Sequence, residues 1–362
     1  MNRRNFLKST AAAAAVASTP WREAVANTTG SWRNYEIVTR VDILKPQGES
    51  RAWIPLPMMD ETGWHRPLGS SWTGNAASAQ IVRDGKYGAA MMVAQWAGGV
   101  PAPVIEVTSG FMTRDRTVDP AKRDPQAGNL APADSAFYTA ATELIPTDGI
   151  VRDTARDIVK GARHDVDKAR AIYEWIVENT FRDPKTRGCG WGDIKSMLET
   201  RNFGGKCGDL NAMFVGLARS VGVPARDVYG LRVAPSIHGY RSLGVGSPNV
   251  SRAQHCRAEF FAQGVGWIPV DPADVRKVML EEPPGDLKID HPMVQAARKR
   301  LFGGWEMNWL AYNMAHDVQL PGSSGAKIPY LMYPNGETGG KALDPLEPDA
   351  FRYEIRSSGV KA

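Results

Sequence analysis

The stretch Gly204-Gly205-Lys206-Cys207-Gly208-Asp209 places a cysteine at the start of a predicted amphipathic helix. Apolar residues then recur at helical spacing, at Leu210, Met213, Phe214, Leu217, Ala218 and Val221. The N-terminal end of a helix carries partial positive charge, which favours the thiolate form of a cysteine. The glycines leave room for a substrate carbonyl, and the first helix amides, including that of Cys207, are suited to holding an oxyanion.

A histidine and an aspartate follow on two short predicted strands, joined by the turn Gln263-Gly264-Val265-Gly266. His255 and Asp271 are equally far from residue 263, so a simple antiparallel hairpin would place them opposite each other, with Cβ atoms about 5 Å apart. The aspartate would then orient the imidazole, which deprotonates Cys207 and later protonates the leaving group. A cysteine flanked by glycines is more often structural, but these three residues together predict a thiol catalytic triad.

The protein has three cysteines, Cys189, Cys207 and Cys256. An odd, low number is not a disulfide scaffold, and at least one thiol must stay free. Whether Cys189 and Cys256 form a disulfide is left open. Because side chains alternate along a strand, we expect Cys256 to point away from His255 and into packing. No CxxC spacing occurs and a histidine next to a cysteine on a strand does not easily share one ion, so we predict no metal site and no cofactor.

Three motifs, the first of them made of two segments, carry a family resemblance. Gly205–Asp209 and Leu217–Arg226 resemble the nucleophile segment of the transglutaminase-like superfamily. His255–Glu259 is similar to its histidine strand, and Gly266–Pro272 to its aspartate segment. Three motifs in the same order make the resemblance specific over roughly residues 140–280.

The resemblance implies an α+β fold with a papain-like transglutaminase core, in which the helix bearing the nucleophile packs on an antiparallel sheet. It also implies that Cys207, His255 and Asp271 are the catalytic residues. The family often has an aromatic residue two positions after the histidine, whereas this chain has Arg257. This departure leaves the substrate specificity open.

The sequence does not determine the second oxyanion donor. Trp191 is a candidate because its indole N–H donates a hydrogen bond and cannot accept one. Asn202 and Gln254 are alternatives, and packing is an equally good interpretation of Trp191. For Asp274, just beyond Asp271, we expect only a local ion pair.

The rest of the chain is predicted to be organised around this core. Alternating apolar residues with strand-edge prolines predict a small β-sandwich before it, and a Pro-, Ala- and Asp-rich stretch predicts a linker. The predicted parts are a signal peptide (1–26), a β-rich N-terminal domain (27–123), a linker (124–150), the catalytic core (151–280), and a C-terminal extension (281–362) whose strands complete or cover the core.

The N-terminus predicts export. Asn2-Arg3-Arg4-Asn5-Phe6-Leu7-Lys8 resembles the twin-arginine export motif, an Ala-rich stretch follows, and Ala24-Val25-Ala26 precedes a predicted cleavage site. Residues 1–26 carry a net charge of +3 out of +5, from four basic residues and one acidic residue. The remaining +2 gives little reason to expect nucleic-acid binding. We therefore predict a periplasmic protein, exported already folded and without stable membrane insertion.

The predicted function is that of an exported thiol enzyme. Cys207 would take the acyl group from an amide in a peptide, protein or cell-wall-type substrate, through a thioester. Water would resolve this thioester in an amidase or peptidase, and an amine in a cross-linking transglutaminase, and the sequence does not separate the two. A third hypothesis is a non-catalytic binding module that keeps the fold, although all three triad residues are present.

Overall fold

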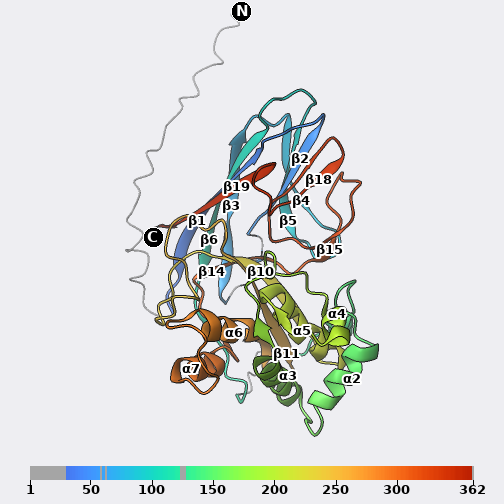
Figure 1. Ribbon diagram of the computed structural model, residues 1–362, viewed down its shortest axis with the longest axis vertical. Coiled ribbons are helices and arrows are strands. Elements are labelled where there is room, and N and C mark those ends of the chain that lie inside the picture. Colours follow the sequence, from blue (N-terminus) through green and yellow to red (C-terminus); the bar gives the residue numbers. More distant parts are fainter. Residues whose placement is uncertain (1–29, 58, 62, 123–127, 361–362) are drawn as a thin grey trace, which may run out of the picture.

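The computed structural model describes residues 30–57, 59–61, 63–122 and 128–360. The predicted signal peptide lies outside the described residues. Two β-sheets pack together at one end of the molecule, and helices surround a third sheet at the other end (Figure 1). Among the described helices, none is both long enough and apolar enough to cross a bilayer.

The first two sheets form the β-sandwich that the sequence predicts. Every second residue of β1 and β6 is buried, because successive side chains of a strand point to opposite faces. Apolar residues such as Val41, Ile54, Met92 and Val107 form the core between the sheets. The sheet order β19-β1-β6-β3 comprises Phe351–Val360, Arg33–Ile43, Val104–Thr113 and His65–Gly74. The order β18-β17-β2-β5-β4 comprises Lys341–Leu343, Asn335–Thr338, Ser50–Pro55, Ala90–Trp96 and Ser78–Arg83.

The C-terminal extension contributes to both halves of the molecule. One of its strands, β14 (Trp309–Asn313), pairs with β10 (Ala225–Arg232) and so extends the sheet of the predicted catalytic core. However, β19 pairs with β1 from Asn34 to Ile43, and β17 pairs with β2 and with β18, so these three strands of the extension complete the N-terminal sandwich instead. The first and last described strands of the chain therefore lie side by side (Figure 1).

The third sheet carries the helix that begins at Cys207. Its order is β12-β11-β10-β14, with β11 spanning Gln254–Ala262 and β12 spanning Gly266–Val270. Helix α5 (Cys207–Ser220) packs on β10 and β11, and other helices cover its opposite side. All its residues except Ser220 are buried, so the expectation of a single apolar stripe on an amphipathic helix is wrong. The helix is buried on every side because a sheet and other helices enclose it, and its polar residues Asp209, Asn211 and Arg219 are buried with hydrogen-bond partners.

The described part of the chain holds six further helices, of which five pack against α5, and the predicted linker is partly helical. One helix, α1, and the start of another, α2, fall within residues 124–150, while residues 123–127 lie outside the described part of the chain. The helices are α1 (Pro132–Thr139), α2 (Gly149–Ile158), α3 (Asp165–Asn179), α4 (Ile194–Thr200), α6 (Pro272–Glu281) and α7 (Pro292–Arg300). The remaining short strands are β7 (Arg116–Thr117), β8 (Phe181–Arg182), β9 (Gly204–Gly205), β13 (Gly304–Trp305), β15 (His316–Val318) and β16 (Ile328–Tyr330).

A buried ion-pair cluster joins the core sheet to β7. Glu259 of β11 is fully buried and accepts hydrogen bonds from Arg116 of β7 and from Arg226 of β10. Burial raises the pKa of Glu259, but the two guanidinium groups outweigh burial and hold this pKa below its ordinary value. The cluster is therefore ionised at neutral pH, and removing its carboxylate would leave Arg116 without its acidic partner and Arg226 with Glu61 alone.

We expect Glu259→Gln to lower the free energy of unfolding by about 3 kcal/mol at neutral pH. Because the folded pKa of Glu259 is lowered, its contribution is present above the unfolded pKa of about 4.3 and is lost as the pH falls through the folded value. Urea unfolding at neutral and acid pH measures both effects. Glu354→Gln is the control, because the pair of Glu354 with Arg356 is exposed. Equal losses in the two variants would contradict the prediction.

Candidate active site

Cys207 is the first residue of α5 and is 5% exposed. The helix begins there because the Asp209 carboxylate turns back and accepts a hydrogen bond from the Lys206 N–H, 3.0 Å away. The next amide, Gly208 N–H, donates to the carbonyl of Cys189 at 2.7 Å. Within the described part of the chain the N–H of Cys207 itself has no hydrogen-bond partner. This amide is therefore the one left to face an oxyanion.

Asp209 also holds the loop that carries Cys189. Its Oδ1 accepts hydrogen bonds from the N–H groups of Trp191 and Gly192, at 3.0 and 2.9 Å. Gly190, at φ +90°, passes so close that a Cβ there would lie 1.8 Å from the carboxylate. The sequence did not indicate this role, because an aspartate in the first turn of a helix resembles an ordinary helix cap.

His255 and Asp271 are brought together behind Cys207. The Nε2 atom of His255 lies 2.7 Å from Oδ2 of Asp271, and both side chains are buried. Asp271 is held by two neighbours: its Oδ1 accepts from the Asp274 N–H at 3.0 Å, as the N-cap of α6, and lies 3.4 Å from Nδ2 of Asn211. With Nε2 turned to Asp271, Nδ1 is the ring nitrogen left for the thiol.

The register that was expected to align these two residues is wrong. The hairpin pairs Phe260 with Ile268 and Ala262 with Gly266, so it is centred on residue 264 rather than 263. In this register position 271 falls opposite Arg257, and β12 ends at Val270 before reaching it. The contact with His255 forms nonetheless, because diagonal neighbours on adjacent strands are within reach of long side chains.

Asp274 is a second buried carboxylate at the histidine, which corrects the expectation of a purely local ion pair. Its Oδ1 lies 3.4 Å from Nε2 of His255. Both its oxygens accept from Arg232 of β10, at 2.5 and 2.7 Å. Arg257 adds a second guanidinium, with Nε 3.6 Å from Oδ2 of Asp271. The two acids are therefore balanced by two buried arginines that sequence spacing alone did not connect to the site.

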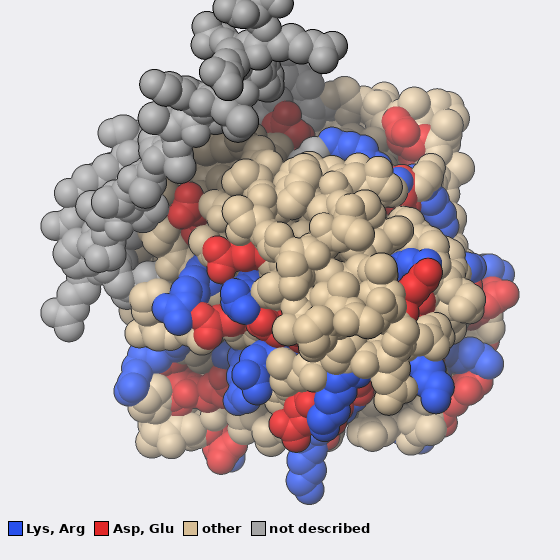
Figure 2. All heavy atoms as spheres, turned by 90° about the horizontal axis from the view of Figure 1, so that it is seen from above, with Lys and Arg blue, Asp and Glu red and all other residues tan. Residues whose placement is uncertain are grey.

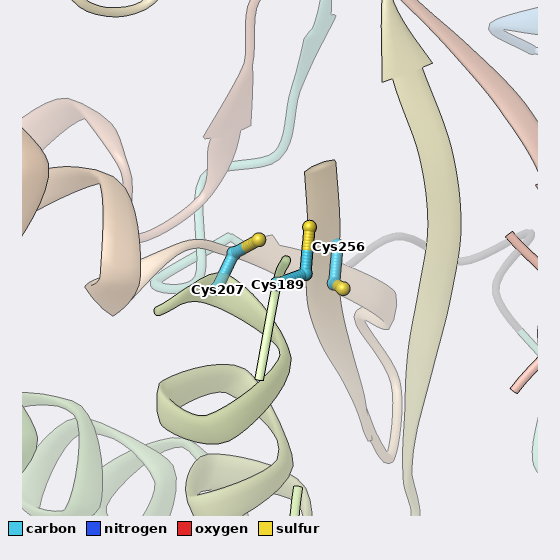
Figure 3. Close-up of side chains that lie close together, drawn as sticks. All are labelled: Cys189, Cys207 and Cys256. Atoms are coloured by element: carbon cyan, nitrogen blue, oxygen red, sulfur yellow. The ribbon is translucent and has the colours of Figure 1, made fainter. Parts of the chain in front are cut away.

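The three cysteines converge at the start of α5. Their sulfur atoms lie within 4.8 Å of one another, and all three thiols are free and buried (Figure 3). Cys256 does point into packing, as expected, together with Ala258 and Phe260 on the core side of β11. The packing partner, however, is the helix that carries Cys207, so the sulfur of Cys256 borders the site. The disulfide question left open between Cys189 and Cys256 is answered in this structure by two free thiols.

The surroundings of the thiol and the imidazole favour opposite charges. Contacts with the Cys189 and Cys256 thiols, together with the contact and charge of His255, hold the pKa of Cys207 well below its ordinary value against the effect of burial. Burial and Arg232 lower the pKa of His255, but Asp274 and Asp271 outweigh them and raise it to about 9. A thiolate and an imidazolium are thus the stable pair between these two pKa values.

We expect Cys207 to react rapidly with iodoacetamide at pH values well below the ordinary thiol pKa of about 8.5. The His255→Ala variant loses the positive partner, so its alkylation should move toward the ordinary pH range. Mass spectrometry with peptide mapping measures the rate at each cysteine. Cys189 and Cys256 are internal controls, because contact with Cys207 raises the pKa of the first and burial that of the second. Alkylation of Cys207 only at ordinary thiol pH would contradict the prediction.

A cleft of about 560 Å³ opens onto the thiol. Cys189, Cys207 and His255 line it, and so does Gln254, one of the three candidate oxyanion donors. Trp191 is 67% exposed and lines a separate hollow with Gly208 and Ala212. Neither Trp191 nor Asn202 is among the residues that line the cleft. The structure therefore brings Gln254 to the cleft, and the assignment of the second donor stays a prediction.

Comparisons with known proteins agree with this geometry. Residues 152–272 match the sequence model of the transglutaminase-like superfamily, and residues 1–20 match that of the twin-arginine translocation pathway signal sequence. A Haemophilus influenzae protein described as an "uncharacterized protein" is 36% identical over 341 residues, which is 89% of this chain and 90% of that protein. A crystal structure described as a "putative cysteine protease" from Cytophaga hutchinsonii shares the fold, with a TM-score of 0.54, 12% identity and 92% of each chain covered.

Fold and site together define an α+β protein with a cysteine, a histidine and an aspartate gathered at the start of a buried helix. The chain belongs to the transglutaminase-like superfamily, whose members are usually cysteine-dependent enzymes. This confirms the fold class and the family that the sequence predicts. The twin-arginine signal sequence indicates that the protein is exported from the cytoplasm.

Proposed function

We propose that this protein is a periplasmic thiol hydrolase that cleaves an amide bond in a peptide, protein or cell-wall-type substrate. The observation that carries the proposal is that Cys207 and His255 line one cleft, with Asp271 buried behind His255. Cys207 lies at a helix N-terminus, His255 contacts it, and Asp271 holds His255 through the 2.7 Å hydrogen bond. Each group has the partner that nucleophilic acyl transfer requires.

The reaction follows from these positions. The Cys207 thiolate attacks the amide carbonyl, and the charge that develops on its oxygen faces the N–H of Cys207. The His255 imidazolium gives its proton to the leaving nitrogen as the carbon–nitrogen bond breaks, which leaves a thioester on Cys207. Water then attacks the thioester, His255 takes the proton of this water, and the carbon–sulfur bond breaks to release the carboxylic acid and restore the thiolate.

Trapping the thioester tests this proposal. Reduced mature protein is mixed with reporter peptides that carry backbone and side-chain amides, quenched in acid, and analysed by mass spectrometry. We expect an acyl adduct on Cys207 and a carboxylic acid product. Preferential transfer to an added primary amine would establish the cross-linking alternative. The absence of adduct and of product across the reporter panel would overturn catalysis and favour the binding module.

The charges that line the cleft indicate the kind of substrate. All of its charged side chains except His255 are basic: Arg182, Lys206, Arg232, Arg252 and Lys277. Asp274 pairs with Arg232, and Glu281 pairs with both Arg182 and Lys277. Within the described residues, Lys206 and Arg252 have no carboxylate within 4.0 Å, which leaves two positive charges facing the cleft. A substrate with a carboxylate near the scissile amide complements them.

Figure 2 shows one face of the molecule, on which neither sign of charge forms a continuous patch. On the face shown in Figure 2, acidic and basic side chains are interspersed around an uncharged centre. A mixed surface of this kind does not offer the continuous basic patch that nucleic acid requires. The view of that face therefore supports the proposed peptide-like partner over nucleic acid.

We expect Arg252→Gln to raise KM about threefold to fivefold for a reporter with a glutamate beside the scissile amide, with kcat unchanged. The magnitude is that of one exposed ion pair, roughly 1 kcal/mol. The matched reporter with glutamine should be unaffected, and added salt should narrow the difference between the two reporters. Arg163→Gln is the control, since Arg163 is exposed and does not line the cleft. Equal KM changes for both reporters would contradict charge recognition.

A further inference from the structure

The cluster of three thiols is larger than the proposed reaction needs. A thiol hydrolase uses one sulfur, yet Cys189, Cys207 and Cys256 meet here from a loop, a helix and a strand (Figure 3). Each thiol is at most 6% exposed. Their sulfur atoms lie within 4.8 Å of one another without a disulfide. Chain segments this far apart in the sequence hold three soft donor atoms at one point.

The spacing of the sulfur atoms suits a single ion. A zinc–sulfur bond is about 2.3 Å long, which places sulfur atoms that share one ion about 4 Å apart. The observed limit of 4.8 Å lies close to this separation and needs only small side-chain rotations. The donors that surround the cluster are soft or polar as well. The thioether sulfur of Met332 lies 3.8 Å from Sγ of Cys256, and the Cys189 thiol donates a hydrogen bond to the Gln254 carbonyl at 3.4 Å.

The surroundings can also balance the charge of such a site. Three thiolates around a divalent ion carry one net negative charge. Because Arg232 and Arg257 already balance Asp274 and Asp271, the positive charges left for the site are those of His255, which acts on Cys207, and of Lys206, which precedes Cys207 in the chain. Cys189 and Cys207 line the cleft, which gives an ion a path from solvent to the buried sulfurs.

We propose that Cys189, Cys207 and Cys256 form a three-sulfur site for one thiophilic metal ion of the Zn²⁺ or Cu⁺ class. Soft thiolate donors select such ions over Mg²⁺ or Ca²⁺. Binding releases the thiol protons of Cys189 and Cys256 to solvent, and the ion bonds to these two sulfurs and to the Cys207 thiolate, which the proposed reaction would use as nucleophile. The metal-bound protein is therefore the inactive form of the proposed hydrolase. The site itself rests only on the positions of the sulfurs, so it stands or falls independently of hydrolysis.

Zinc binding to the full mature chain, reduced and kept under anaerobic conditions, tests this site. We expect one Zn²⁺ per chain by isothermal titration calorimetry and native mass spectrometry. X-ray absorption spectroscopy of the loaded wild-type protein should show three sulfur neighbours at about 2.3 Å. This measurement needs no variant, so it holds even where a substitution of buried Cys256 prevents folding. One sulfur with nitrogen or oxygen neighbours, or no binding, would overturn the proposal.

Variants then separate this site from a simple pairing of the ion with Cys207 and His255. We expect Cys189→Ser and Cys256→Ser each to weaken Zn²⁺ binding by about a hundredfold, at least as much as the loss of an outer partner does. His255→Ala is the matched comparison, and it should leave the sulfur count unchanged. Loss of binding in His255→Ala, with unchanged binding in the two serine variants, would assign the ion to the cysteine–histidine pair and overturn the three-sulfur site.

Discussion

Cys207→Ala is expected to remove the amide hydrolysis catalysed by this protein, with a fall in kcat on the order of 10⁴-fold to 10⁶-fold. Among the described residues that line the cleft, only Cys207 both begins a helix and places its sulfur against His255. Losing the nucleophile from a triad costs about as much as losing the whole triad, because the three residues act as a unit. Initial rates with the reporter amides identified by acyl trapping measure the effect.

The design of this experiment separates lost chemistry from lost structure. Alanine fills part of the thiol's volume and belongs to the good helix formers, so α5 should begin at the same place. Near-wild-type unfolding curves for Cys207→Ala are therefore expected, with intact binding of the reporter peptide measured by calorimetry. Wild-type rates in Cys207→Ala would contradict the thiol mechanism. Equal loss of activity and of folding would call for Cys207→Ser, which keeps nearly the same shape.

Asp271→Asn is expected to have the second largest effect, with a fall in kcat of about 10²-fold to 10⁴-fold. Asparagine caps a helix as well as aspartate does, so the hydrogen bond from the Asp274 N–H that begins α6 can be kept. The substitution removes the charge and the acceptor that hold Nε2 of His255 in place. The imidazole then loses both its orientation and part of the stabilisation of its charged form.

The pH dependence gives this prediction a readout that a purely structural role would not change. Asp274 and Asp271 raise the pKa of His255 to about 9 against burial and Arg232, so the thiolate–imidazolium pair persists up to that pH in the wild type. In Asp271→Asn the pKa of His255 should fall, and the alkaline limb of the kcat/KM profile should move to lower pH. An unchanged alkaline limb with reduced kcat would show that Asp271 does not act through His255.

Much of the site could be predicted from sequence because its motifs are local. The helix start at Cys207 depends on the hydrogen bond from the Lys206 N–H to the Asp209 carboxylate, three residues further on, and the hairpin that carries His255 depends on a short glycine turn. The export signal is likewise a local pattern, and its match to the twin-arginine model supports it. The alternation of the sandwich strands is local as well. Such features can be predicted because they depend only on residues close together in the chain.

What could not be predicted depends on which distant segments meet. Asp274 is joined to Arg232 across 42 positions, and this pair decides how the charge of His255 is balanced. A second sulfur near the nucleophile is that of Cys256 on β11. The sequence predicted that the Cys256 side chain points into packing, but not that α5 is the element packed against it. A hairpin register can shift by two positions without changing which residues face the core, so spacing could not decide it.

The sequence by itself therefore determined the family, the order of the cysteine, histidine and aspartate segments, and the β-rich region before them. Only the tertiary structure decided that the last strand, β19, closes the first sheet beside β1, that α5 is enclosed on all sides, and that three thiols share one point. The physical reason is the range of the interactions. Helix starts, turns and strand alternation are set by residues a few positions apart, whereas burial, charge balance and sulfur clustering are set by packing between segments that the chain keeps far apart.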